Sequence, residues 1–530
     1  MGNLKFLDCY RTDQSIRYVF YTFLAISFLL RMFYANKLSL ATDESYYWTW
    51  SENLSLGYYD SGAILGWVIR FFTNIFGYHE VAVRTGSLIL MTGTSLILYR
   101  LAKKFISPIL AVCAVILFNI TPGGGLVGVL MMHDSFMIFF WSLTTLLLYK
   151  AIFENKKSLW YFSGISAGLG LWSKDIMVLG YISAFLFLLL SQKHRFWLKR
   201  KEPYLAFLLS ILVFSPIIYW NFTHNFVTYR HIFALGTRPM GLDQFKRMGD
   251  FLGSQLGLVS PFIFLGILAA WINILIKWFK TYDSQKLFLL LFSFFIFLFF
   301  FLLSAKSKVE GNWSGFAYLL GIVCYFYILE DIWRLRTTNK LKYLGYTLFS
   351  AIFSFLLVLI MFNPIILYKL AYNMPGVSAN IIEEVRGNRT NDINGWREFG
   401  KKIYNFRDNY LKNYLDTDFF FFTLRYQVAT ELWFYYPQVP KKRVYCLPIA
   451  RRMNQLDIWW GLDVLAGQNG VFVAEHKETK RIMPYFDSVE LVHSFTVHRD
   501  DLKDEAIRTY YLYLCRNFKG MERKDYFESY

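Results

Sequence analysis

The stretch "LATDESYYWTWSENLSLGYYDSGAILGW", from Leu40 to Trp67, interrupts a chain whose first 370 residues are otherwise dominated by apolar runs. It places acidic, hydroxylated and aromatic residues directly after the first apolar segment, with Asp43 and Glu44 side by side. Two adjacent carboxylates at the edge of a bilayer lose hydration and repel each other unless something uses them. The acidic pair is therefore the first place where we expect chemistry.

The composition is that of an integral membrane protein. Of the 530 residues, 55% are hydrophobic and 20% are aromatic, which a soluble domain has no means of burying. A bilayer core needs about 20 apolar residues per helix, and such runs recur, most plainly from Leu287 to Leu303. We expect the first apolar segment to stay as an anchor, because it has no small-residue cleavage site.

The net charge of +18 lies in the membrane half of the chain. Residues 1–370 hold 33 Lys and Arg against 17 Asp and Glu, whereas residues 371–530 hold 23 against 21. The basic residues gather between apolar runs, around Arg11, Lys103, Lys156, Lys199, Lys280 and Arg336. This is the pattern of cytoplasmic loops in membrane proteins. It argues against nucleic-acid binding.

The basic clusters and the apolar runs together predict about eleven transmembrane helices. We expect them at 16–34, 81–99, 107–122, 134–152, 158–173, 176–191, 203–221, 257–276, 287–304, 314–331 and 343–367. With the N-terminus inside, the outer segments are 36–80, 123–133, 173–175, 222–256, 305–313 and everything after 368. Most of the unusual polar residues fall in these outer segments.

The first outer loop has two further features. Four of its aromatic residues predict a belt at the membrane interface, namely Tyr46, Tyr47, Trp48 and Trp50. The segment from Ala63 to Gly77 is apolar but short and carries Arg70, which predicts a helix lying in the interface.

Two later polar residues each allow two interpretations. Asp134 stands at the outer end of a predicted helix, where it either caps the helix or serves a reaction. Lys174 either neutralises its neighbour Asp175, the commoner outcome, or meets a phosphate.

The last 160 residues predict a small α/β domain. Five extended patterns read as strands, namely "DFFFFTL", "KRVYCLP", "GVFVAEH", "VELVHSFTV" and "RTYYLYLCRNF", with a helix from Tyr426 to Tyr436. Cys446 and Cys515 either form a disulfide, which an oxidising periplasm permits, or are buried separately in two strands.

Several stretches resemble the GT-C superfamily of polytopic glycosyltransferases. Within it, the chain is similar to the bacterial relatives of the dolichyl-phosphate-mannose protein mannosyltransferases, a group that includes the lipid A aminoarabinose transferase. The matching stretches are "DESYYWTWSENLSLGYYDSGAILGWVIRFFTNIFGYHEVAVR", "HDSFMIFFWSLTTLLLYKA", "GLGLWSKDIMVL", "SPIIYWNFTHNFVTYRH", "EGNWSGFAYL", "INGWREFGKKI", "YQVATELWFYYP" and "MNQLDIWWG". The resemblance implies a transmembrane catalytic domain over 1–370, with a periplasmic first loop at 36–80, and a periplasmic α/β domain over 371–530.

The resemblance also implies an activity and a location. The family moves a sugar from a polyprenyl-phosphate carrier to an extracytoplasmic acceptor, with inversion at the anomeric carbon, here at a bacterial inner membrane. Its acidic signature maps onto Asp43 and Glu44, and a second acidic position maps onto Asp134. Many relatives have a His-Pro-Pro or Lys-Pro sequence where this chain has Ser61, Gly62 and Ala63, so one candidate cation for the carrier phosphate is missing.

The remaining candidates are polar or aromatic residues on the predicted outer side. We expect substrate contacts from Tyr58, Tyr59, Asp60, Arg84, His133, Lys174, Lys308, Asn312 and Trp313, with Lys174 and Arg84 ranked first for the leaving phosphate. No firm metal site emerges, although Glu44 and Asp134 are candidates for holding a divalent cation. The predicted partners are the carrier-linked sugar, the acceptor and membrane lipids.

The acceptor decides the role of Asp43. A hydroxyl acceptor needs a general base, which we assign to Asp43, whereas a lipid A phosphate is already ionised and needs only orientation. Lipid A or a related envelope glycolipid is the favoured acceptor, with protein Ser/Thr as the alternative. A flippase for lipid-linked sugars is a rival class, but it predicts internal repeats and charges within the bundle. A non-enzymatic export partner is a third class.

Overall fold

The structure is a computed structural model, and it divides the chain into two compact units. It describes residues 13–60, 62–237, 243–334, 340–363, 365–366, 392–411, 419–436, 443–449, 451–459, 461–477, 479–500 and 506–521. The first unit comprises Met1–Ala35, Ser61–Val68 and Arg84–Phe362. The second comprises Asn36–Asp60, Ile69–Val83 and Asn363–Tyr530, so the acidic loop belongs with the C-terminal domain.

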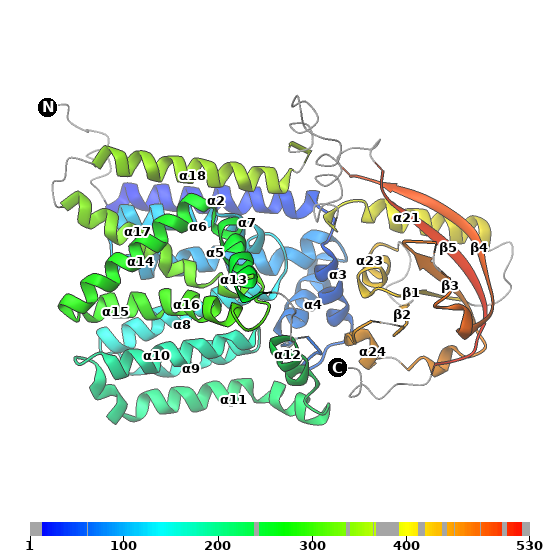
Figure 1. The fold of residues 1–530 in the computed structure, drawn as a ribbon, viewed down its shortest axis with the longest axis horizontal. Coiled ribbons are helices and arrows are strands. Elements are labelled where there is room, and N and C mark those ends of the chain that lie inside the picture. The colour runs from blue at the N-terminus through cyan, green and yellow to red at the C-terminus, as the bar shows by residue number, and fades with distance from the viewer. Residues whose placement is uncertain are drawn as a thin grey trace. The chain divides into compact units, whose positions relative to one another are not determined.

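The first unit is a bundle of helices (Figure 1). Within the described residues, seven segments are long and apolar enough to cross a membrane, judged by length and composition: α2 (Asp13–Lys37), α5 (Glu80–Ala102), α8 (His133–Phe153), α11 (Lys201–Thr223), α14 (Pro261–Thr281), α15 with α16 (Ser284–Leu291 and Phe294–Ser304) and α18 (Lys340–Phe362). The chain is therefore a multi-pass membrane protein, as predicted.

The other four predicted spans also contain helices, but shorter or more polar ones. They are α6 (Pro108–Asn119), α9 (Ser158–Leu171), η1 with α10 (Asp175–Val178 and Leu179–Leu190) and α17 (Ala317–Arg334). Every predicted segment is thus helical, while the count of eleven crossings stays a prediction.

Beyond the first outer loop, three helices of the described residues lie in segments that we predicted as loops. They are α7 (Pro122–Val127), α12 (Val227–Thr237) and α13 (Gln244–Val259). The Asp243 side chain accepts the Phe245 N–H at 3.2 Å and so caps α13. This helix buries Phe251, Gln255 and Val259, one residue per turn, and leaves its other residues half-buried or exposed. A search for long apolar runs misses such an amphipathic helix, because its mean hydropathy is low.

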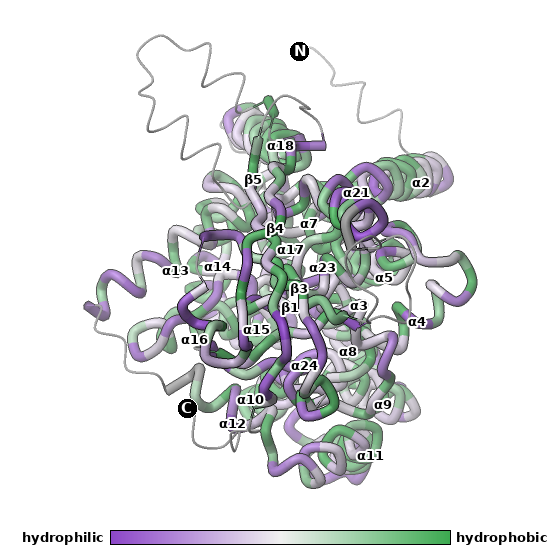
Figure 2. Tube along the Cα trace, turned by 90° about the vertical axis from the view of Figure 1, so that its right-hand side faces the viewer, coloured by the Kyte–Doolittle hydropathy of each residue, from purple (hydrophilic) through white to green (hydrophobic). Residues whose placement is uncertain are grey.

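Glycines allow close helix packing in this unit. A Cβ atom added to Gly164 of α9 would lie 2.2 Å from the carbonyl oxygen of Ala206 in α11, and one added to Gly168 would lie 2.7 Å from Cβ of Val213. Small residues serve this purpose in membrane bundles. Large apolar residues are left exposed on the bundle, as along α2, where Leu29 and Phe33 are 63% and 60% exposed. Figure 2 shows the hydropathy along the chain.

The second unit is built on a five-stranded sheet in the order β2-β1-β3-β5-β4 (Figure 1). The strands are β1 (Phe419–Thr423), β2 (Val444–Cys446), β3 (Asn469–Ala474), β4 (Phe486–His498) and β5 (Ala506–Phe518). β1 pairs in parallel with β2 and β3, whereas β5 runs antiparallel to both β3 and β4. All five predicted strands are confirmed.

The second unit also contains helices that accompany the sheet and two buried cysteines. α21 (Trp396–Phe406) places the ring of Phe399 4.4 Å from that of Tyr510 on β5. The predicted helix between β1 and β2 is α23 (Tyr426–Tyr435). Cys446 and Cys515 are both buried and both free, so the second of the two interpretations is confirmed.

The aromatic residues of the first loop form a core rather than an interfacial belt. They lie on α3 (Thr42–Glu52), where Tyr46, Trp48 and Trp50 are at most 3% exposed. Tyr46 packs on Tyr426 and Trp48 packs on Trp433, with ring centroids 4.7 and 5.6 Å apart. The prediction of a belt was wrong for these residues, because aromatic content alone does not distinguish a lipid-facing ring from a buried one. α4 (Ile64–Phe76) forms the predicted short helix, and its place at the membrane interface stays a prediction.

Candidate active site

Asp43 lies in the first turn of α3, where the C-terminal domain supplies its neighbours. Its half-buried carboxylate accepts a hydrogen bond from the Tyr426 hydroxyl, and the charge of Arg452 acts on it. Burial raises the pKa of Asp43 above its ordinary value, and Arg452 and Tyr426 oppose that rise. The result is a carboxylate that takes up a proton more readily than a free aspartate does.

Glu44 takes a different position from its neighbour. It is fully buried, and its Oε2 atom accepts the backbone N–H of Ala41 at 2.9 Å. A carboxylate in the first turn also interacts favourably with the helix dipole. One residue further, the hydroxyls of Ser45 and Thr430 lie 2.9 Å apart and tie α3 to α23. Glu44 therefore stabilises the start of α3, and its position favours a structural role.

Asp60 lies later in the same loop and, like Asp43, is affected by the charge of Arg452. We call the two carboxylates and the residues around them the acidic cluster: Asp43, Asp60, Tyr46, Tyr426, Arg452 and Gln455. Its carboxylate accepts the Tyr46 hydroxyl at 2.5 Å, and the Tyr46 oxygen in turn accepts the Gln455 backbone N–H at 2.8 Å. Burial raises the pKa of Asp60 to about 6, against the opposing effects of Tyr46 and Arg452. Repulsion from Asp43 contributes to this rise. Two acidic side chains with elevated pKa values thus face one guanidinium.

The segment that carries Arg452 and Gln455 is held rigidly. Arg451 makes a two-point ion pair with Asp457, at 2.6 and 2.7 Å. Its Nη2 atom also donates to the Cys446 carbonyl oxygen at 2.7 Å, at the end of β2. Two-point guanidinium pairs of this kind fix geometry as well as charge. Arg452 is therefore presented to the acidic cluster from a fixed backbone.

The predicted tyrosines of the first loop are enclosed. Tyr58 and Tyr59 are both 0% exposed. The Tyr58 ring stacks on Trp50 at 4.3 Å, and its hydroxyl donates to the Trp50 carbonyl oxygen at 2.9 Å. The backbone N–H of Tyr59 donates to the Gln455 side chain at 2.6 Å. In this structure both rings shape the loop that carries Asp60, and neither is open to a substrate.

Asp134 has its own group of partners, all within the first unit. It is the second residue of α8, and its two carboxylate oxygens accept the Lys174 ammonium at 2.8 Å and the Asn312 amide at 3.0 Å. The helix cap itself is Met132, so Asp134 is not the capping residue. Lys174 does not pair with Asp175, which rules out the first of its two interpretations. Lys174 adopts an extended backbone before η1, and its ammonium pairs with Asp134 instead.

A small cavity opens beside this ion pair. It has a volume of about 150 Å³. Asp134 contributes a carboxylate and Asn312 an amide to its lining, which also includes Leu126, Val127 and Leu258. A cavity that is apolar with a few converging polar groups is the usual form of a ligand site. Asp134 and Asn312 give this otherwise largely apolar cavity a polar end.

The other predicted residues of the first unit are more dispersed. Arg84 is fully buried and donates to the Ala35 carbonyl oxygen at 2.9 Å, a position that favours a structural role. Lys308 pairs with Glu310 at 2.9 Å, with side chains 62% and 52% exposed.

His133 and Trp313 flank the Asp134 group in sequence. His133 is buried as the first residue of α8, and its carbonyl oxygen accepts the Ser173 hydroxyl at 3.0 Å. Trp313 lies in η3 (Gly311–Ser314), next to Asn312, with its ring centroid 6.3 Å from that of Phe300.

The residues do not fit a divalent-cation site. In the part of the chain that the structure describes, no three His, Cys, Asp or Glu residues group as ligands. Both oxygens of Asp134 already accept donors, and Glu44 is bonded to its own helix start. We therefore derive no step through a metal ion.

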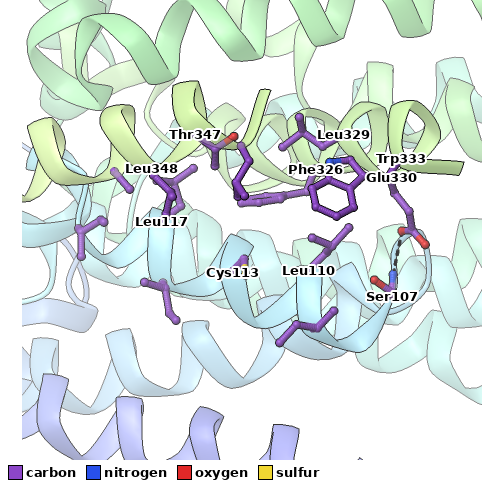
Figure 3. Close-up of a pocket in the computed structure, with 15 residues that line it drawn as sticks. Ser107, Leu110, Cys113, Leu117, Phe326, Leu329, Glu330, Trp333, Thr347 and Leu348 are labelled. Atoms are coloured by element: carbon purple, nitrogen blue, oxygen red, sulfur yellow. Dashed lines mark hydrogen bonds between the residues drawn. The ribbon is translucent and has the colours of Figure 1, made fainter. Parts of the chain in front are cut away.

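A larger cavity in the first unit has a different character. It holds about 450 Å³ between α6, α17 and α18, and Figure 3 shows Leu110, Leu117, Phe326 and Leu348 around it. The polar contact drawn there, from the Ser107 N–H to Glu330 at 2.9 Å, lies at one end (Figure 3). An apolar space of this kind does not suit a sugar.

Three residues of the acidic cluster were not predicted from the sequence. Tyr426, Arg452 and Gln455 come from the C-terminal domain. They stand in or beside the stretches "YQVATELWFYYP" and "MNQLDIWWG", which were noted for their resemblance alone. The resemblance to a family was the signal that could have identified these three residues as part of the site. Nothing in the local sequence indicates that they approach Asp43 and Asp60.

Comparisons with known proteins agree with this architecture. Residues 60–220 match the family model described as dolichyl-phosphate-mannose-protein mannosyltransferase. The lipid A galacturonosyltransferase RgtD of Rhizobium johnstonii is 26% identical over 293 residues, which are 55% of this chain and 61% of that protein. The match thus spans less than two thirds of the relative.

Solved structures give the same answer for the fold. ArnT from Cupriavidus metallidurans in its apo state superposes with a TM-score of 0.60 and 13% identity, over 94% of this chain and 97% of that one. Its complex with undecaprenyl phosphate gives 0.58 and 12%, over 94% and 98%. At such identities the likeness shows the fold alone. The predicted resemblance is confirmed: the chain has the GT-C fold, and its residues 60–220 carry the sequence pattern of the dolichyl-phosphate-mannose-protein mannosyltransferase family.

Proposed function

We propose that the protein is an inverting glycosyltransferase that moves a sugar from a polyprenyl-phosphate carrier to lipid A or another envelope glycolipid. The observation that carries the acceptor class is the 293-residue match to a lipid A galacturonosyltransferase. The matched family is described by a dolichyl-phosphate-linked sugar, which supports a prenyl-phosphate donor.

The proposal includes a location. The basic loops indicate which side faces the cytoplasm, so the loop at 36–80 and the domain at 371–530 would face the periplasm from a bacterial inner membrane. The transmembrane catalytic domain would then comprise residues 1–370.

Asp43 is the residue that we propose as the base for a hydroxyl acceptor. The acceptor oxygen forms a bond to the anomeric carbon, the bond from that carbon to the carrier phosphate breaks, and the Asp43 carboxylate takes the hydroxyl proton. A positioned base typically contributes about 10² to 10⁴-fold, and the raised pKa of Asp43 suits it to accept a proton. With a lipid A phosphate as acceptor there is no proton to remove, and Asp43 and Arg452 would orient the reactants.

For the carrier phosphate we propose Lys174. It is a point charge held in place by Asp134, and positive charge beside a leaving phosphate stabilises the charge that develops there. Asp134 and Asn312 would fix the ammonium, and the adjoining cavity would take the part of the carrier nearest to the phosphate.

A transfer assay in reconstituted vesicles tests the function. The purified protein is given radiolabelled undecaprenyl-phosphate galacturonic acid or mannose, together with lipid A or a Ser/Thr-rich peptide. Label on lipid A supports the proposal, and label on the peptide redirects it to protein glycosylation. Label that crosses the bilayer unchanged indicates a flippase. No transfer and no crossing with either sugar would overturn the enzyme assignment.

A matched pair of variants ties the result to the site. D43N removes the proposed base, whereas D463N removes a carboxylate from an exposed position of the same unit. Transfer that is lost in D43N and kept in D463N supports the assignment of Asp43.

A further inference from the structure

Arg31 is a buried cation in α2, a helix that is largely exposed on the surface of the bundle. It lies in α2 and is 8% exposed, whereas its neighbours Leu30 and Met32 are 52% and 45% exposed. The helix thus turns one charged residue inward from an otherwise apolar surface. Charged residues inside membrane segments are rare and usually mark a functional contact.

Asn119 of α6 binds the guanidinium of Arg31. The Nη2 atom of Arg31 donates to Oδ1 of Asn119, at the end of α6, at 2.7 Å. The amide nitrogen of Asn119 is engaged with the Ser95 hydroxyl at 3.0 Å and the Val115 carbonyl oxygen at 2.7 Å. These bonds fix the amide with its oxygen toward Arg31.

Gly128 makes room for the same group. A Cβ atom at this position would lie 2.3 Å from Nε and 2.8 Å from Cζ of Arg31. Any residue other than glycine at position 128, just after α7, would therefore displace the guanidinium of Arg31. The hydrogen bond to Asn119 and the space left at Gly128 thus define the place of the guanidinium.

The charge of Arg31 is not balanced by the chain as far as it is described. Among the described residues no carboxylate pairs with Arg31, and the Asn119 amide is its hydrogen-bond partner. A guanidinium has five N–H donors, and an unpaired charge away from water is costly. The arrangement calls for an anion that comes from outside the chain.

The position of Arg31 indicates the kind of anion. It lies six residues before Lys37, the last residue of α2, which is about 9 Å along the helix axis. Lipid phosphates lie near the ends of such helices, and Arg binds phosphate through paired N–H groups. We propose that Arg31, Asn119 and Gly128 form a binding site for the phosphate of a membrane lipid, either a phospholipid or the prenyl carrier.

The site is tested by lipid-dependent stability, which needs no transfer activity. Wild type, R31M, R31K and G128A are purified in a sugar-based detergent that carries no phosphate, and melting is followed by tryptophan fluorescence. Phosphatidylglycerol or undecaprenyl phosphate is then added to each. We expect the anionic lipid to raise the melting temperature of the wild type, R31K to keep part of that shift, and R31M and G128A to lose most of it. K193M, which removes an exposed charge from another loop, should respond like the wild type.

The two sources and a purely structural role give different outcomes. A shift with undecaprenyl phosphate alone assigns the site to the carrier, and a shift with both lipids assigns it to any lipid phosphate. Without anionic lipid, R31M should melt at or above the wild-type temperature, because an unbalanced buried charge has been removed. If R31M instead melts lower and both proteins gain equally from the lipids, Arg31 is structural and the proposal fails.

Discussion

The phenol of Tyr46 donates a 2.5 Å hydrogen bond to the carboxylate of Asp60, and its oxygen accepts the Gln455 backbone N–H at 2.8 Å. Tyr46 therefore joins the end of the acidic loop to a segment about 400 positions later in the chain. The same segment presents Arg452 to Asp43 and Asp60. The acidity of both carboxyl groups consequently depends on the C-terminal domain being folded.

The first prediction concerns the charge of Asp43. D43N should lower transfer to a hydroxyl acceptor by about 10² to 10⁴-fold, because the amide cannot take the proton. The melting temperature should stay level or rise slightly, because burial disfavours the ionised carboxylate. Initial rates and melting curves of the same preparation separate the two effects. Wild-type rates in D43N would remove Asp43 from the mechanism.

Arg452 should set the pH at which Asp43 is active. Burial raises the pKa of Asp43 and Arg452 lowers it, so R452Q should raise that pKa further. The acid limb of the pH–rate profile should then move upward by about one pH unit, with R452K remaining near the wild type. R516Q removes an exposed arginine of β5 and is the matched control. An unchanged acid limb in R452Q would exclude this role.

Asp60 should make stability depend on pH between about 4 and 6. Its folded pKa of about 6 lies above the unfolded value near 4, so the folded protein binds this proton more tightly. The contribution of this group is full below pH 4 and is lost as the pH rises to 6, by at most about 3 kcal/mol. D60N should flatten that part of the melting profile, while D463N should follow the wild type. A D60N profile with the wild-type slope would contradict the assignment.

The sequence predicted those parts of the fold that depend on local pattern. Long apolar runs predicted the helices in the eleven expected spans, and alternating or apolar runs predicted all five strands. The amphipathic α13 was missed because it buries only one residue per turn, including the polar Gln255, and so contains no long apolar run. The rings of Tyr46, Trp48 and Trp50 were misplaced because hydropathy cannot tell a buried ring from one in contact with lipid.

The candidate site was predictable to the extent that its residues are close in sequence. Asp43 and Asp60 stood out as acids next to an apolar segment. Arg452 and Tyr426 did not, because their approach depends on the tertiary fold of the second unit. The Asp134 partner of Lys174 was not predicted for the same reason: Asp175 is adjacent in sequence, whereas Asp134 is adjacent in space.

The pairing of Lys174 with Asp134 makes the last prediction. The two side chains are 17% and 13% exposed, so K174M or D134N alone leaves a largely enclosed charge without its partner. Each single variant should lose about 2–4 kcal/mol of stability, and the double variant K174M/D134N should regain most of it. The exposed pair Lys277–Asp331, at 37% and 32%, is the control, and K277M should cost under about 1 kcal/mol. If Lys174 meets the carrier phosphate, the double variant will fold like the wild type and still fail to transfer sugar. Recovery of transfer together with stability would show that the pair only holds α8 against the end of α9.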